Sequence, residues 1–150
     1  IIVSKILVAS DGSGSSEDAE NYVSQLYHPS RDEVVVVSVA HMPGIVAGDG
    51  EDEIGETGVD VGNIDEKFRQ RTKAAAENTA ERLRNEGFDV EVAIREGHPG
   101  PEICDVVDEE DIDVVMMGKR GQTDSEQPYL GSVSQYVVHN ANSPVNVVPH

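Results

Sequence analysis

Three glycines, Gly118, Gly121 and Gly131, have the residue type and the spacing of a site that holds phosphate groups. Two residues separate the first pair, nine separate the second from the third, and Gly131 is followed at once by Ser132. Phosphate binds where several backbone N–H groups point outward and no Cβ blocks the approach, as at a helix N-terminus. Ser132 is expected to cap such a helix and to donate its hydroxyl to an anion. Ordinary turn and cap glycines are the alternative that the spacing leaves open.

Short apolar runs alternate with helical patterns, and these elements must position the glycines. Runs that are apolar on both faces suit strands buried between layers of helices. A first helix is predicted after a cap at Ser15 or Ser16, and a second after a cap at Asn63 with Gly87 at its end. Strands are expected at residues 6–9, 34–37, 89–94, 112–117 and 145–148, and further helices at 99–109 and 132–140.

The apolar residues of the first two helices recur at helical spacing, which places them along one face of each helix. These faces are expected to carry Ala19, Tyr22, Val23, Leu26, Ile64, Phe68, Ala75, Thr79 and Leu83.

Strands that alternate with helices in this way predict a three-layer α/β domain with a parallel sheet. Ligands of such sheets bind at the carboxyl ends of the strands, near the point where the strand order reverses. The residues that follow three of the strands are therefore expected to converge, namely Ser10, Asp11, Gly12, Ala40, His41 and residues 118–121.

The acidic composition limits the classes of partner. The chain has 29 acidic and 11 basic residues, which gives a formal net charge of -18. A charge of this sign argues against binding to nucleic acid or to an anionic membrane. Because the excess is spread along the chain and self-repulsion of this size needs screening, we expect a surface adapted to high salt, as in a halophile. An ordinary acidic cytoplasmic protein is the alternative.

Length and apolar content predict one domain over residues 1–150 and no membrane span. Residues 44–63 are rich in glycine and acids, contain no basic residue and are expected to form a mobile loop. The apolar runs are far shorter than the roughly 20 residues that cross a bilayer. Cys104 is the only cysteine, so no intramolecular disulfide can form. A cytoplasmic location is expected.

Several segments together resemble the universal stress protein family. The glycines and Ser132 reproduce the G-x2-G-x9-G-(S/T) signature of its ATP-binding branch. The resemblance implies a doubly wound, Rossmann-like sheet of five parallel strands in the order 3-2-1-4-5, with ATP held across their carboxyl ends. It rests on KILVASDGS at 5–13, SVAH at 38–41, REGHPGPEI at 95–103, IDVVMMGKRG at 112–121 and SPVNVVP at 143–149.

The resemblance also implies a role for individual residues. Asp11 would accept sugar hydroxyls near the adenine, whose edge would meet the backbone at Val39. Gly118 would lie by the ribose and Gly121 by the phosphates, while Met117 is either near the nucleotide or plain core. The ligand implied is ATP with Mg²⁺ or Mn²⁺. The nucleotide-binding set that follows is Ala9, Asp11, Val39, Met117, Gly118, Gly121, Gly131, Ser132, Val133 and Ser134.

Acidic residues near the glycines are not expected in a simple phosphate site. Asp124 and Glu126 would oppose the phosphates unless they face solvent or a metal, and Lys119 and Arg120 either offset them or form a solvated pair. In the family, the strand that corresponds to residues 145–148 commonly meets its copy, so the resemblance implies a homodimer.

The sequence contains no strong catalytic constellation. Its five histidines lack the spacing of zinc ligands, and Ser13 lies outside any G-x-S-x-G pattern. The Walker pattern is missing, and Asp11 lacks the acidic neighbour that a receiver domain needs. We therefore expect an ATP-dependent switch or sensor in stress response. A dimeric interaction module without nucleotide and a slow ATPase are the alternatives.

Overall fold

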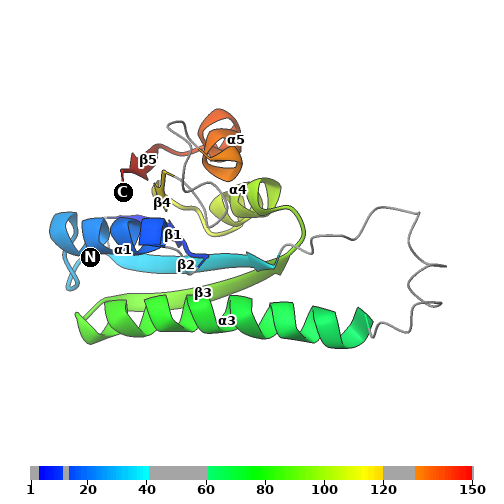
Figure 1. Ribbon diagram of the computed structural model, residues 1–150. Helices are drawn as coiled ribbons and strands as arrows, with labels where there is room; N and C mark the ends of the chain where they lie inside the picture. Colours follow the sequence, from blue (N-terminus) through cyan, green and yellow to red (C-terminus); the bar gives the residue numbers. More distant parts are fainter. Residues whose placement is uncertain (1–3, 12–13, 41–60, 120–130, 150) are drawn as a thin grey trace.

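The computed structural model describes residues 4–11, 14–40, 61–119 and 131–149 (Figure 1). The described strands and helices alternate along the chain, as the sequence pattern predicts. They are β1 (Lys5–Ala9), α1 (Gly14–Leu26), β2 (Glu33–Ala40), α3 (Val61–Asn85), β3 (Asp89–Glu96), α4 (Pro99–Glu109), β4 (Val114–Gly118), α5 (Ser132–Asn140) and β5 (Val145–Val148).

The five strands form one parallel sheet in the order β3-β2-β1-β4-β5. Strand β1 lies at the centre, where Leu7 pairs with Val35 of β2 on one side and with Val115 of β4 on the other. The chain moves outward from β1 to β3 and then crosses back to β4, so the strand order reverses between β1 and β4. The predicted doubly wound α/β fold, including its strand order, is confirmed.

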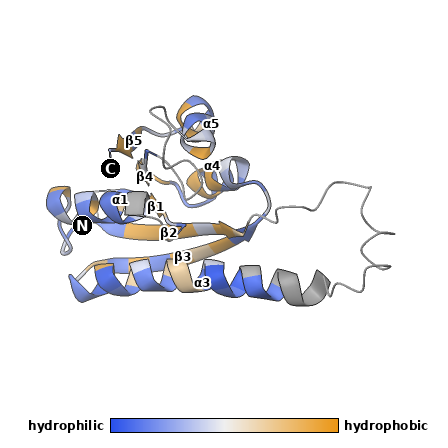
Figure 2. Cartoon of the chain, viewed as in Figure 1, coloured by the Kyte–Doolittle hydropathy of each residue, from blue (hydrophilic) through white to orange (hydrophobic). Residues whose placement is uncertain are grey.

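Helices cover both faces of this sheet, α1 and α3 on one face and α4 and α5 on the other (Figure 1). Side chains alternate along β1, so Ile6 and Val8 pack beneath α1 and α3 while Leu7 packs beneath α4 and α5. Figure 2 shows the resulting contrast between β2, which is mostly hydrophobic, and the mostly hydrophilic α3. Strands that are buried on both faces need continuous apolar runs, which explains the valines of β2.

Two helices begin earlier than their predicted caps. Helix α1 starts at Gly14, so Ser15 and Ser16 belong to its first turn, and α3 starts at Val61, two residues before Asn63. These cap assignments were wrong, because a serine or an asparagine near a helix start favours the region without selecting the residue.

The buried face of α1 is narrower than the face that its apolar residues form. Ala19 and Val23 are fully buried, whereas Tyr22 is 39% exposed and Leu26 is 51% exposed. Ala19 and Val23 lie four residues apart and face the sheet directly, so Tyr22 lies at the border of the contact. The helical spacing predicted the helix, but it did not indicate which of its apolar residues are exposed.

Other boundaries agree with the sequence. Helix α3 ends at Asn85 and is followed by Gly87, whose φ of 103° lies in the region that favours glycine. Helices α4 and α5 and strand β5 occupy the predicted residues.

Two carboxylates accept backbone hydrogen bonds at the amino ends of the strands. Asp32 is only 2% exposed, and its carboxylate accepts hydrogen bonds from the backbone N–H groups of Ser4 at 3.1 Å and His28 at 2.9 Å. The carboxylate of Asp113 accepts the backbone N–H of Lys5 at 2.8 Å. Both acids therefore satisfy backbone donors where a loop enters the sheet.

No helix within these ranges combines the length and the apolar character that crossing a bilayer requires. Of the acidic segment 44–63, residues 44–60 lie outside the described part of the chain, and residues 61–63 belong to α3.

Candidate nucleotide site

A pocket of about 130 Å³ lies at the carboxyl ends of β1, β2 and β4, where α4 and α5 begin. It therefore occupies the point at which the strand order reverses, as expected for this topology. An apolar cavity of about 150 Å³ holds a benzene ring, so this pocket suits a group of about that size. The residues that line it are Ala9, Ser10, Asp11, Ser16, Val37, Val39, Pro99, Ile103, Met117, Gly118, Val133 and Ser134.

Most of the predicted binding residues lie at this pocket. Ala9, Asp11, Val39, Met117, Gly118, Val133 and Ser134 line it, and Gly131 and Ser132 form the start of α5 beside the last two. Gly121 lies outside the described residues, as do Gly12 and His41.

The apolar part of the wall comes from three elements. Val37 and Val39 of β2 project toward the α4 and α5 side of the sheet, as does Met117 of β4, and Ile103 of α4 faces them. Ala40 was expected at the site but does not line it, because alternation along β2 turns its side chain to the opposite face. The apolar part of the wall can accept a flat ring.

Ser10 and Asp11 form the edge of the pocket at the end of β1. Ser10 is 5% exposed and its backbone N–H donates to the carbonyl of Val37 at 2.9 Å, which extends the sheet by one residue. Asp11 is exposed and lines the pocket next to it. A carboxylate in this place can accept hydrogen bonds from hydroxyl groups of a ligand.

Gly131, not Ser132, is the N-cap of α5. The carbonyl of Gly131 accepts the first helical bond from the N–H of Gln135 at 2.9 Å, and Ser132 is the exposed first residue of the helix. The predicted cap at Ser132 was therefore wrong by one position. Gly131 has φ of −65° and ψ of 161°, an extended conformation that any residue adopts, so the backbone here does not itself require glycine.

The start of α5 is tied to the end of β4. The backbone N–H of Gly131 donates to the carbonyl of Lys119 at 2.8 Å, and the buried hydroxyl of Ser134 donates to the carbonyl of Gly118 at 2.8 Å. The Ser134 hydroxyl hydrogen is thus occupied within the protein. An anion at this helix would meet the free backbone N–H groups and the positive end of the helix dipole.

Sequence reasoning missed the contribution of α4. Pro99 and Ile103 line the pocket from its first turns, after His98 as N-cap. A Cβ at Gly100 would lie 2.6 Å from the ring of Tyr136, so this glycine allows α4 and α5 to pack closely. The sequence predicted the helix itself, since proline in the first turn marks a helix start, but it gave no signal that this helix would line the pocket.

The described residues contain no group of three or more histidine, cysteine or acidic side chains that could hold a metal ion.

Residues 3–149 match the model of the universal stress protein family. The chain belongs to this family. It is 35% identical over 82 residues to universal stress protein MJ0577 of Methanocaldococcus jannaschii, a match that covers 55% of this chain and 51% of that protein. The solved structure of MJ0577 superposes with a TM-score of 0.80 at 29% identity and covers 100% of this chain and 98% of that one.

Two more distant members of the family were solved with nucleotides. The protein from Archaeoglobus fulgidus in complex with dAMP has a TM-score of 0.65 at 21% identity, with 99% of each chain covered. The Arabidopsis thaliana family protein with AMP bound has a TM-score of 0.64 at 19% identity, with 99% of this chain and 92% of that chain covered. At these identities the likeness shows the shared fold.

Proposed function

We propose that this protein binds an adenine nucleotide, ATP with Mg²⁺ or Mn²⁺, and works in the cytoplasm as a nucleotide-dependent switch or sensor in stress response. The observation that carries the proposal is the pocket at the strand reversal, where an apolar wall, an exposed carboxylate and the start of a helix meet. Each of the three has a counterpart in a nucleotide, namely the base, the sugar and the phosphates.

The base is assigned to the apolar wall formed by Val37, Val39 and Met117, because a ring loses little by leaving water there. The sugar is assigned to Asp11, whose carboxylate accepts hydroxyl hydrogens. The phosphates are assigned to the N-terminus of α5, with Gly131 and Ser132 at its start. The family members solved with dAMP and AMP support this choice of ligand class.

The test is to identify the small molecules released when the purified protein is denatured, by mass spectrometry, and then to measure binding by calorimetry. We expect adenine nucleotide among the released molecules, and ATP with Mg²⁺ to bind to nucleotide-free protein more tightly than GTP with Mg²⁺. The proposal would be contradicted if the purified protein released no nucleotide and if added ATP did not bind to it at high salt. This result would favour the alternative of a dimeric interaction module.

A homodimer through β5 is the second part of the proposal. Strand β5 is paired with β4 alone within the described chain, and Val145 and Val147 are partly exposed. An unpaired apolar edge invites pairing with a copy of itself. Slow ATP hydrolysis stays a separate question, which a phosphate-release assay with a Gly131 variant as control would answer.

A further inference from the structure

A buried cluster of hydroxyl groups lies behind the end of β1, on the side of the sheet that α3 covers. Ser10, Ser38 and Thr79 are 5%, 2% and 3% exposed. The Ser10 and Thr79 hydroxyl oxygens are 3.0 Å apart, and the Ser38 hydroxyl donates to the Ser10 carbonyl at 2.5 Å. Three elements, β1, β2 and α3, therefore meet at one residue of the pocket.

Every polar group of Ser10 is engaged in this way. Its N–H is held by Val37, its carbonyl by Ser38 and its hydroxyl by Thr79. The first two contacts come from β2, the neighbouring strand, whereas the third comes from α3 and spans 69 residues of sequence. Within the described residues, the Thr79 contact is the hydrogen bond that ties the Ser10 side chain to a helix.

Thr79 is itself held in place by a charged pair. The guanidinium of Arg82 lies 3.5 Å from the Thr79 hydroxyl oxygen and binds the buried carboxylate of Glu20 on α1 at 2.7 and 2.8 Å. A guanidinium only donates hydrogen bonds, so it contacts the oxygen of Thr79 and favours donation of the Thr79 hydrogen to Ser10. The hydrogen bond to Glu20 raises the pKa of Arg82, which keeps it a donor.

We propose that Thr79 is a positioning residue for the pocket, because its hydroxyl fixes Ser10 and thereby the direction of the adjacent Asp11. This inference rests on the proposed function, in which Asp11 meets the sugar of the nucleotide. Thr79 lies behind the strand end and is not among the residues that line the pocket. Its effect on affinity passes through Ser10.

The chemistry distinguishes this role from simple packing. Valine has nearly the shape of threonine, so Thr79→Val keeps the volume of the core and replaces the hydroxyl by a methyl group, which cannot hydrogen-bond. The Ser10 hydroxyl is then buried without its partner, a costly state that rotation toward the pocket would relieve. Such a rotation changes the edge of the site while the fold is retained. Thr79→Ser keeps the hydroxyl.

The experiment compares Thr79→Val and Thr79→Ser with Ser143→Ala, a matched control at the amino end of the sheet. The Ser143 hydroxyl donates to the carbonyl of Ile112 at 2.6 Å, far along the strands from the pocket. Calorimetry with ATP and Mg²⁺ at high salt should give about fivefold weaker binding for Thr79→Val. Binding should stay within about twofold of wild type for Thr79→Ser and for Ser143→Ala, even where the control lowers the melting temperature.

A double-variant cycle with Ser10→Ala tests the same inference, and its comparison of the double variant with Ser10→Ala can still be made if Thr79→Val alone folds poorly. Ser10→Ala removes the group that Thr79 positions, and replacing both partners by apolar groups restores a satisfied core. The effect of Thr79→Val on affinity should then largely disappear in the Ser10→Ala background. An equal loss in both backgrounds, wild-type affinity in Thr79→Val, or a similar loss in Thr79→Ser would each overturn the inference with the proposed function intact. Failure of the wild type to bind adenine nucleotide would overturn both.

Discussion

The two ends of the sheet use polar residues in different ways. At the amino ends, Asp32 and Asp113 direct their carboxylates onto backbone N–H groups of entering loops, and the chain passes straight into the strands. At the carboxyl ends, Ser10 and Ser134 also bond backbone, but a pocket stays open beside them. Helices α4 and α5 begin at this end, so their N-termini and the strand ends surround the same space.

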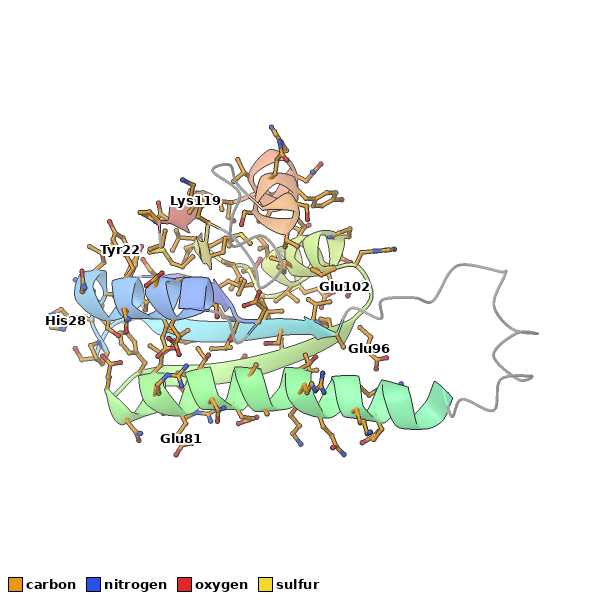
Figure 3. All side chains as sticks on the ribbon, in the orientation of Figure 1. Tyr22, His28, Glu81, Glu96, Glu102 and Lys119 are labelled. Atoms are coloured by element: carbon orange, nitrogen blue, oxygen red, sulfur yellow. The ribbon has the colours of Figure 1, made fainter. Side chains whose placement is uncertain are left out.

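The difference shows that the position of the pocket follows from the direction in which the strands and helices run. In a parallel sheet every helix runs back antiparallel to the strands, so helix N-termini and strand carboxyl ends gather on one side. Acidic side chains, by contrast, are spread over many elements, as Figure 3 shows for Glu81 on α3, Glu96 of β3 and Glu102 on α4. Composition alone therefore cannot distinguish the two ends.

The largest expected effect is a complete loss of ATP binding from a substitution at the carboxyl end of the sheet. Gly131→Val places a side chain at the start of α5, in the space that the proposed phosphates need, so ATP binding should be abolished. Valine readily adopts the extended backbone conformation of Gly131, so the fold should be largely kept. Calorimetry and circular dichroism check the two statements. Wild-type affinity for ATP in this variant would favour the alternative that the glycines are ordinary turn and cap residues.

Assembly should be independent of both ends. Val147→Lys places a charge on the β5 edge, which lies between them, and should convert the proposed dimer to monomers. Because the described pocket is built from one chain, the monomers should bind ATP as the wild type does. Light scattering and calorimetry provide the two readings. A wild type that is already monomeric at working concentration would contradict the dimer.

At the amino end, Asp32→Ala should lower stability without changing the pocket. The substitution leaves the N–H groups of Ser4 and His28 without their acceptor, which should cost about 2–3 kcal/mol of unfolding free energy. Denaturant unfolding measures this loss, and Asp32→Asn, which keeps one acceptor oxygen, should lose less. A large fall in ATP affinity of the folded variant would break the proposed separation of the two ends.

At the carboxyl end, Asp11→Ala should weaken nucleotide binding and have little effect on stability. Asp11 is exposed, so its removal should lower the free energy of unfolding less than removal of the buried Asp32 does. Adenosine and ATP should both bind about tenfold more weakly, since the proposed partner is the sugar and a hydrogen bond to a charged group contributes about 1.5–3 kcal/mol. Calorimetry with the two ligands tests this, and a loss confined to ATP would contradict the contact of Asp11 with the sugar and indicate a role at the metal ion that accompanies the phosphates.

Salt should act on the whole surface. Lowering ionic strength from about 1 M to about 0.01 M lengthens the screening distance from about 3 Å to about 30 Å. With a formal charge of -18, repulsion then extends across the molecule, and the melting temperature should fall by a few degrees for about 1 kcal/mol. Thermal scans over this range test the proposed adaptation to high salt. A melting temperature that stays constant or rises as the salt concentration is lowered would contradict the proposed adaptation to high salt.

Local signals explain what could be predicted from the sequence. Proline in the first turn and glycine after the last turn are constraints within a few residues, so α4 and the end of α3 agree with prediction. The apolar runs marked β1, β4 and β5 for the same reason. The strand order came from the family resemblance, since spacing alone predicts a parallel sheet but not which strands are neighbours.

Contacts between residues far apart in the sequence could not be predicted from it. Thr79 reads in the sequence as one position on the buried face of a helix, and only the packing of α3 against the sheet brings it to Ser10. Exposure of Tyr22 and Leu26 likewise depends on how α1 lies on the strands. The helices and strands could be predicted from the sequence because propensity and periodicity act locally, and the role of the glycines stays a prediction. The walls of the pocket depend on which side chains from separate elements meet, and that is set by packing.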